Sequence, residues 1–184
     1  MTCIVGVIDG GRVILGADSA ASCDDEIYRL PESKVFCNGS YVIGVTGSYK
    51  LGELLRFKAC LPDPPKGSDD LKPFLVRHLM PVVAEVVRAE GAAHEGLRIL
   101  GPRTGFMLGC RGQLWHVDPD LTVSREGSFA SIGSGRLRAY AALYVLEKAE
   151  VGPAKRRLEL ALEAAAEYTA SVRGPWQFVE SEGA

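Results

Sequence analysis

The sequence predicts an α+β fold in which two antiparallel β-sheets pack face to face and a pair of helices covers each outer side, a four-layer αββα sandwich. Segments with strand and helix patterns follow one another as two hairpins, two helices, further strands, two helices and a last strand. A sandwich built in that order buries the apolar face of every segment. The 184 residues are enough for one core, so we expect a single domain over residues 1–184.

Two β-hairpins are predicted to open the chain. Their turns are Asp9-Gly10-Gly11 and Asn38-Gly39, because Asp-Gly and Asn-Gly pairs adopt the tight turns that join antiparallel strands. Apolar and β-branched runs beside these turns predict strands at 2–7, 13–17, 34–37 and 41–45. A polar stretch over residues 19–33 separates the two hairpins.

The middle of the chain predicts two helices. Ser48 can cap a helix that runs to about residue 60 and is ended by the proline-rich segment 61–67. A longer helix follows from Asp69 or Asp70 to about residue 89, where apolar residues recur at steps of three and four. Pro81 is expected to kink this helix.

The second half of the chain predicts strands and then two more helices. Gly174-Pro175 is expected to end the last helix before a short closing strand. The expected strands are 105–110, 113–117, one or two within 122–132, and 176–179, and the expected helices are 137–149 and 154–172.

The composition excludes several functions. A formal net charge of -2 and a pI of about 6.0 provide no strongly basic face, so nucleic acid is not expected as a partner. No segment reaches the roughly 18 apolar residues needed to cross a membrane, and the start of the chain lacks the features of a secretory signal. The five cysteines are scattered without CxxC spacing, which favours a reducing cytoplasm over disulfides or zinc. The three histidines lie far apart, so we expect no metal and no other cofactor.

Thr2 is the first candidate for catalysis. Methionine aminopeptidases remove Met1 before small residues, and this would leave Thr2 with a free amine. An α-amine has a pKa of about 7.7 to 8.0 and can act near neutral pH as the base that a hydroxyl nucleophile needs. Thr2 can therefore supply both nucleophile and base. The alternative interpretation is an ordinary residue at the start of a strand.

Asp18 and Lys34 are the next candidates. Asp18 ends an apolar strand at residues 13–17, where a buried carboxylate needs a partner, and Lys34 begins the next predicted hairpin. A lysine near Thr2 would favour loss of the hydroxyl proton and would help to keep the amine neutral. The alternative is a buried ion pair that only joins two strands.

Gly47 and Ser134 each lie between a strand and a helix. The Gly47 amide belongs to the donors at a helix N-terminus, which can stabilise an oxyanion, although Gly-Ser is also a common way to begin a helix. The Ser134 hydroxyl can order the Thr2 amine, or it can simply cap the following helix. Cys3 is expected to point to the opposite face of its strand and to be a buried core thiol.

Together these segments resemble the N-terminal-nucleophile hydrolases, in particular the proteasome β-subunits and bacterial HslV. The resemblance rests on the segments TCIVGV, GADS, SKVF, GVTGS and IGSG, whose order and spacing match that family. It extends over most of the chain, since ALEAAAEYTASVRGPW is similar to the closing helix of small proteasome-like proteins.

The resemblance implies a role for each of the candidates and adds others. Thr2 is the nucleophile, its amine is the base, Asp18 and Lys34 are the charge pair, Gly47 supplies an oxyanion amide, and Ser134 orients the amine. Glu167 is the nearest acid to the aspartate that the family carries on its last helix, and Ser171 loosely matches the serine that follows. By position, Ala21, Thr46 and Lys50 line the substrate pocket.

The resemblance also implies an activity and partners. Members of the family cleave peptides inside closed rings, and those similar to HslV receive unfolded proteins from a partner ATPase. We therefore expect a cytoplasmic threonine endopeptidase in a homo-oligomeric ring. Two alternatives stay open, namely an amidase or acylase that uses the same terminus on small molecules, and a proteasome-like assembly subunit without catalytic activity.

Overall fold

A computed structural model of the chain describes residues 2–23, 26–93, 99–101 and 103–183. Within these residues the first main sheet has the strand order β10-β1-β2-β11. Its strands are β1 (Cys3–Asp9), β2 (Arg12–Ala17), β10 (Phe129–Gly133) and β11 (Gln177–Glu180). The second sheet has the order β5-β6-β7-β8-β9. Its strands are β5 (Val35–Asn38), β6 (Tyr41–Thr46), β7 (Gly105–Cys110), β8 (Gln113–Val117) and β9 (Val123–Arg125). Neighbouring strands in both sheets are antiparallel.

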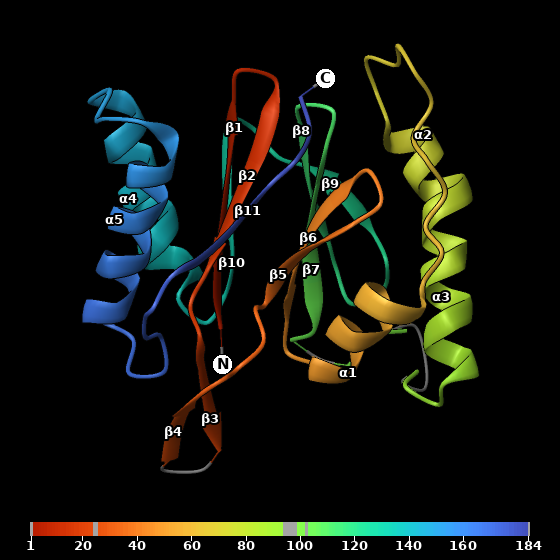
Figure 1. Cartoon of the computed structure of the whole chain (residues 1–184), viewed down its shortest axis with the longest axis horizontal. Coiled ribbons are helices and arrows are strands. Elements are labelled where there is room, and N and C mark those ends of the chain that lie inside the picture. Colours follow the sequence, from red (N-terminus) through yellow and green to blue (C-terminus); the bar gives the residue numbers. More distant parts are fainter. Residues whose placement is uncertain (1, 24–25, 94–98, 102, 184) are drawn as a thin grey trace.

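Helices form the two outer layers, as Figure 1 shows. On one side α4 (Arg136–Lys148) and α5 (Ala154–Glu167) pack against the first sheet. On the other side α1 (Tyr49–Glu53), α2 (Lys72–Phe74) and α3 (Met80–Ala89) cover the second sheet. The predicted αββα sandwich of two antiparallel sheets and flanking helices is therefore confirmed. None of the described helices is both long enough and apolar enough to span a bilayer.

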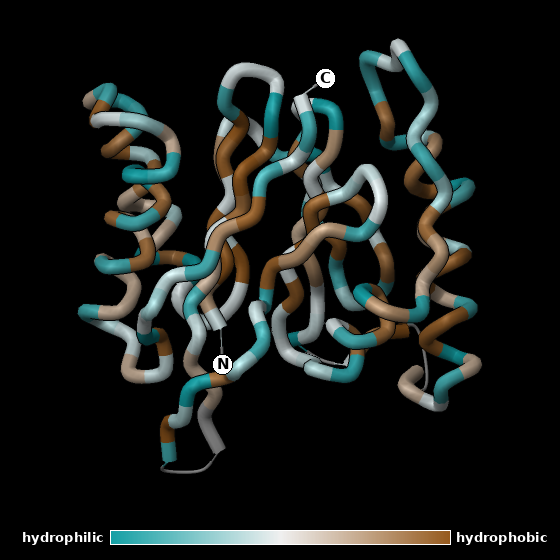
Figure 2. Tube along the Cα trace, viewed as in Figure 1, coloured by the Kyte–Doolittle hydropathy of each residue, from teal (hydrophilic) through white to brown (hydrophobic). Residues whose placement is uncertain are grey.

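Three apolar clusters hold the layers together. The cluster between the sheets includes Ile4, Leu15 and Met107, all fully buried. The cluster beneath α4 and α5 includes Leu158, and the cluster beneath α1 and α3 includes Trp115. Figure 2 shows the same distribution, with hydrophobic residues concentrated on the strands and polar residues on the loops and outer helix faces. Burial of apolar area in these interfaces provides the main stabilisation of the fold.

The strand register brings distant parts of the chain to the start of β1. Ile4 pairs with Ala17 on β2, so Asp18 lies beside the first residues of the chain. Cys3 pairs with Gly133 on β10, so Ser134 comes to the same place. The strand register alone therefore brings Thr2, Asp18 and Ser134 together at one end of the first sheet.

The structure differs from the sequence prediction in the polar stretch 19–33. That stretch contains a small hairpin, β3 (Ala20–Cys23) and β4 (Glu26–Arg29), which is separate from both main sheets. All four residues of β4 are exposed, so the strand lacks the alternation of apolar and polar residues that would have indicated it.

Two predicted helices also differ in detail. The last helix ends at Glu167 and not at residue 172. At and beyond this end, the Arg173 guanidinium donates hydrogen bonds to the carbonyls of Ala166, Thr169 and Val172, which satisfies acceptors that a longer helix would have paired with its own amides. The helix before Pro81 is π-helical over Leu75–Leu79, and a π-helical segment at Leu54–Lys58 also continues α1. Pro81 consequently falls in the first turn of the α-helical part, where a missing N–H is tolerated.

Candidate active site

Thr2 lies at the start of β1, with only 6% of its surface exposed. Its nitrogen donates a hydrogen bond to Ser134 Oγ at 3.2 Å, and Ser134 Oγ donates to the Thr2 carbonyl at 3.1 Å. Gly133 has a φ of 94°, and a Cβ there would collide with the Thr2 carbonyl. Only glycine therefore allows the end of β10 to approach the chain start closely enough for this pair of hydrogen bonds.

Asp18 and Lys34 form a buried ion pair directly beneath the chain start. Lys34 Nζ lies 2.9 Å from Asp18 Oδ1 and 3.0 Å from Oδ2, and it also donates to the Ala20 carbonyl at 2.5 Å. The Asp18 carboxylate accepts from the amides of Cys3 at 2.8 Å and Ala20 at 3.2 Å. The carboxylate thus connects the lysine to the residue that follows Thr2.

Burial dominates the electrostatics of this pair. It raises the pKa of the Asp18 carboxyl, while the Lys34 charge opposes the rise. It lowers the pKa of the Lys34 ammonium, against the opposing effect of Asp18. Each group therefore depends on the other to stay charged, which is the state that carries the hydrogen bonds above.

Gly47 occupies the turn between β6 and α1. Its φ is 83°, and an added Cβ would lie 2.5 Å from the Arg103 carbonyl oxygen and 2.8 Å from the Thr104 Cα, so a side chain is excluded on two grounds. The next residue caps α1, since Leu51 N donates to Ser48 Oγ at 3.2 Å. The turn at Gly47 therefore begins a helix, as the sequence indicated, and its backbone also packs closely against the backbone of Arg103 and Thr104.

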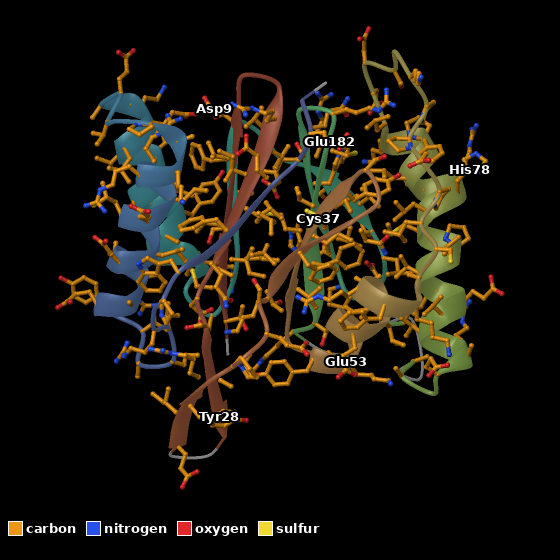
Figure 3. All side chains as sticks on the ribbon, in the orientation of Figure 1. Asp9, Tyr28, Cys37, Glu53, His78 and Glu182 are labelled. Atoms are coloured by element: carbon orange, nitrogen blue, oxygen red, sulfur yellow. The ribbon has the colours of Figure 1, made fainter. Side chains whose placement is uncertain are left out.

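Two pockets open on either side of Thr2, and both include Thr2 and Gly47 in their walls. The first has a volume of about 390 Å³ and includes Lys34, Glu53 and Arg56. Figure 3 shows Glu53 on α1, at the end of the sandwich where β1 begins. The second pocket has a volume of about 760 Å³ and lies between the end of β10 and the start of β7.

The three residues predicted to line the substrate pocket lie in different places. Thr46 lies in the wall of the second pocket, but the walls of both pockets, as far as described residues form them, contain neither Ala21 nor Lys50. Ala21 is fully buried in β3, and Lys50 is exposed on α1. In the described residues neither side chain contributes to these two pocket walls, and a role for either in substrate binding stays a prediction.

Glu167 and Ser171 also lie outside both pocket walls among the described residues. Glu167 is exposed at the last residue of α5. Ser171 is 2% exposed, and its Oγ has no hydrogen-bond partner within the described part of the chain. Neither residue makes a described hydrogen bond to Thr2 or Ser134, so the structure does not join them to the cluster around the chain start.

Cys3 faces away from the pockets, as predicted. Its side chain is fully buried in the cluster beneath α4 and α5. Burial raises the pKa of its thiol to about 12, and the Asp18 charge adds to the rise. The thiolate that a nucleophilic cysteine requires is therefore disfavoured at neutral pH.

The second pocket contains residues that the sequence did not indicate. Arg103 precedes β7, His116 and Asp118 lie on and after β8, and Arg136 begins α4. They come from three separate segments and carry no shared motif, so only the folded structure brings them together. No group of three or more His, Cys, Asp or Glu side chains in the described residues is arranged to hold a metal ion.

The sandwich and its strand order are shared with solved structures of proteasome-like proteins. The chain is similar to BPH of Thiobacillus denitrificans in complex with epoxomicin, with a TM-score of 0.81, 20% sequence identity and coverage of 100% of both chains. BPH alone gives the same TM-score and identity over 100% of this chain and 99% of BPH.

HslV from Trypanosoma brucei has the same fold. It is similar with a TM-score of 0.71 and 20% identity, over 97% of this chain and 98% of HslV. No protein-family model matches the chain, and no curated protein sequence matches it significantly. At this level of identity the solved structures establish the fold alone.

Proposed function

We propose that this protein is a threonine-type N-terminal-nucleophile hydrolase, which cleaves peptide bonds through Thr2 after Met1 has been removed. The observation that carries the proposal is the arrangement around Thr2. Its nitrogen is held by Ser134, a buried Asp18–Lys34 pair lies beneath it, and a pocket opens on each side. A purely structural ion pair would not need to adjoin two pockets that meet at one hydroxyl-bearing residue.

In the first step the Thr2 amine takes the proton of the Thr2 hydroxyl. A free α-amine with a pKa of about 7.7 to 8.0 is partly neutral near pH 7.5, and the neutral form can accept the proton. Ser134 Oγ, 3.2 Å from the nitrogen, orients the amine. Lys34 lies in the wall of the same pocket as Thr2 and favours the developing alkoxide through its charge.

Thr2 Oγ1 then attacks the scissile carbonyl carbon. A C–O bond forms and the carbonyl π bond gives an oxyanion, which the Gly47 amide stabilises by a hydrogen bond. When the oxyanion collapses, the C–N bond breaks and the leaving nitrogen takes the proton held by the Thr2 ammonium. The acyl group stays on Thr2 as an ester, and water attacks this ester with the amine again as base. The bond between the acyl carbon and Thr2 Oγ1 then breaks, Oγ1 takes the proton back from the ammonium, and the carboxylic acid product leaves.

The position of the amine decides how the substrate lies. The leaving nitrogen of the substrate must reach the proton on the Thr2 amine. Ser134, which accepts a hydrogen bond from the Thr2 nitrogen, lies in the wall of the second pocket. The leaving half of the substrate therefore occupies the second pocket. The acyl half occupies the first pocket, over Lys34 and beside Arg56.

We further propose a homo-oligomeric ring in the cytoplasm that receives unfolded proteins from a partner ATPase. The similarity in fold to HslV and BPH supports this proposal. Native mass spectrometry tests the ring, with one multiple of the 19.8 kDa chain as the expected species. A monomer at micromolar concentration would contradict it.

Hydrolysis of unstructured protein and of short fluorogenic peptides tests the activity. Mature protein should cleave them, while Thr2→Ala, in which Met1 is still removed, should be inactive and Thr2→Ser should retain activity. Thr122→Ala replaces an exposed threonine outside both pockets and is the matched control. Equal hydrolysis by Thr2→Ala and the mature protein would exclude Thr2 as the nucleophile. Cleavage of small amides alone would favour a small-molecule amidase.

A further inference from the structure

The second pocket carries two arginines that the mechanism above does not use. Arg103 comes from the loop before β7, and Arg136 comes from the first turn of α4. Both residues are exposed, and within the described part of the chain neither guanidinium has an ion-pair or hydrogen-bond partner. Two unneutralised cations therefore border a space of about 760 Å³ that begins at Thr2.

The other charges in this wall do not cancel the two arginines. Asp118 is the single carboxylate among the described residues of the wall, and its Oδ1 lies 3.8 Å from His116 Nε2. Two arginines face one aspartate in the described wall, so its side chains carry an excess of positive charge.

The first pocket shows the contrast. It contains two carboxylates, on Glu32 and Glu53, and its cations already have partners. Lys34 is paired with Asp18, and Arg56 lies 3.3 Å from Glu32 and stacks over the Phe36 ring at 4.4 Å. Positive charge that is available to a ligand is thus concentrated on one side of Thr2, the side of Ser134.

We propose that the second pocket is a carboxylate-binding subsite, in which Arg103 and Arg136 select substrates whose leaving half carries a carboxylate close to the cleaved bond. The inference rests on the proposed function, which puts the leaving half in this pocket. The carboxylate can belong to an aspartate or glutamate side chain after the cleaved bond, or to the C-terminus of a short leaving segment. Guanidinium groups suit both sources because they bind carboxylates through charge-assisted hydrogen bonds.

Three peptides with one common acyl half test the subsite and separate the two sources. The leaving half is leucine amide, glutamate amide or leucine with a free carboxylate. For mature protein we expect kcat/KM to be about tenfold higher or more for at least one carboxylate substrate than for leucine amide, as charge-assisted binding implies. Preference for the glutamate amide peptide indicates recognition of the side chain. Preference for the peptide that ends in leucine with a free carboxylate indicates recognition of the chain end.

Arg103→Gln and Arg136→Gln should each reduce that preference, measured as the ratio of kcat/KM for the carboxylate substrate to kcat/KM for leucine amide. Arg138→Gln is the matched control, because Arg138 is also exposed on α4 but lies outside the wall of the second pocket. Raising the salt concentration should weaken the preference in the mature protein. Equal kcat/KM for the three substrates, or an unchanged preference in both pocket variants, would overturn the subsite.

Failure of the proposed function gives a different result. In that case a folded, mature protein cleaves none of the three peptides, and the subsite is then tested by binding. Calorimetry with Thr2→Ala and a short acidic peptide should show binding that Arg103→Gln weakens and Arg138→Gln does not. Absence of binding, or equal binding by the two variants, would overturn the subsite independently of catalysis.

Discussion

At the scale of single residues, Asp18 and Lys34 hold the chain start in place through charge. Lys34→Met leaves the fully buried Asp18 carboxylate without its cation. We expect the free energy of unfolding to fall by about 3–5 kcal/mol, because an uncompensated buried charge remains. Urea denaturation of the variant and the parent measures the difference.

The double variant Asp18→Asn with Lys34→Met is the control for this prediction. It removes both charges, so it should recover much of the lost stability while activity stays absent. If the double variant instead loses as much free energy of unfolding as the two single variants added together, the two residues are not coupled. A loss below about 1 kcal/mol for Lys34→Met would contradict the burial argument itself.

The same variant has a predictable pH dependence. Burial already raises the pKa of Asp18, and removal of Lys34 removes the main opposing effect, so the folded-state pKa rises further above the unfolded value. A carboxyl with a raised folded pKa contributes stability below the unfolded pKa and loses it as pH rises through the folded pKa. Lys34→Met should therefore become less stable relative to the parent as pH rises from the ordinary carboxyl range. A constant difference across that range would contradict the account.

The cysteines give a prediction that needs no activity. Burial raises the pKa of the Cys3 and Cys110 thiols to about 12, while Cys60 and Cys37 are exposed. Iodoacetamide at pH 8 should modify Cys60 in the folded protein much faster than Cys3 or Cys110. Peptide mapping over time measures the rates, and urea should make them similar. Rapid native modification of Cys3 would contradict its assignment as a core thiol.

Much of the site could be predicted at this scale because its residues stand in short, local patterns. Thr2 is fixed by the chain start, and Asp18 stands out because it ends an apolar strand. Arg103 and Arg136 could not be found in that way, since exposed arginines are common and no pattern joins residues from separate segments. Glu167 was predicted only by position, and the earlier end of α5 places it on an exposed helix terminus.

At the scale of elements, the β6–α1 turn connects the second sheet to the candidate site. Gly47→Ala would combine a φ of 83° with a Cβ 2.5 Å from the Arg103 carbonyl oxygen. We expect a loss of about 1–3 kcal/mol in stability from the backbone strain, and a larger relative loss of hydrolysis, because the turn carries the proposed oxyanion amide. Thermal unfolding and kcat/KM together measure the two effects.

Gly52→Ala is the matched control for the turn. Gly52 lies in α1, and an added Cβ there meets nothing within 4 Å. Alanine should therefore leave stability unchanged or raise it by up to about 1 kcal/mol through its higher helix propensity. Similar losses for the two variants would show that the conformation of Gly47 is not specifically required.

Elements were predictable where hydrophobic periodicity was strong. The core strands and α3 followed their apolar patterns, because those patterns are imposed by the two faces they must bury. The β3–β4 hairpin was missed because β4 is exposed along its whole length. The end of α5 was missed because the carbonyls there are paired with the Arg173 side chain, a set of contacts that hydrophobic periodicity does not indicate.

At the scale of the whole molecule, the sandwich brings the ends of β1, β2, β6 and β10 to one edge, as Figure 1 shows. The layers could be predicted from the order of the elements, because few arrangements bury so many apolar faces. The two pockets could not be predicted from the sequence, because their walls combine loops whose course depends on the packing of both sheets. The fold is shared with HslV and BPH, whereas the walls of the candidate site are formed by this chain's own residues.

The most direct test of the central claim is the intact mass of mature protein after incubation with epoxomicin, the compound bound to BPH. Peptide mapping of the product identifies the modified residue. The account predicts loss of Met1 and one adduct on the peptide that begins at Thr2, with no adduct on Thr2→Ala. A protein that has lost Met1 and still forms no adduct at Thr2, or equal modification of Thr2→Ala, would contradict it.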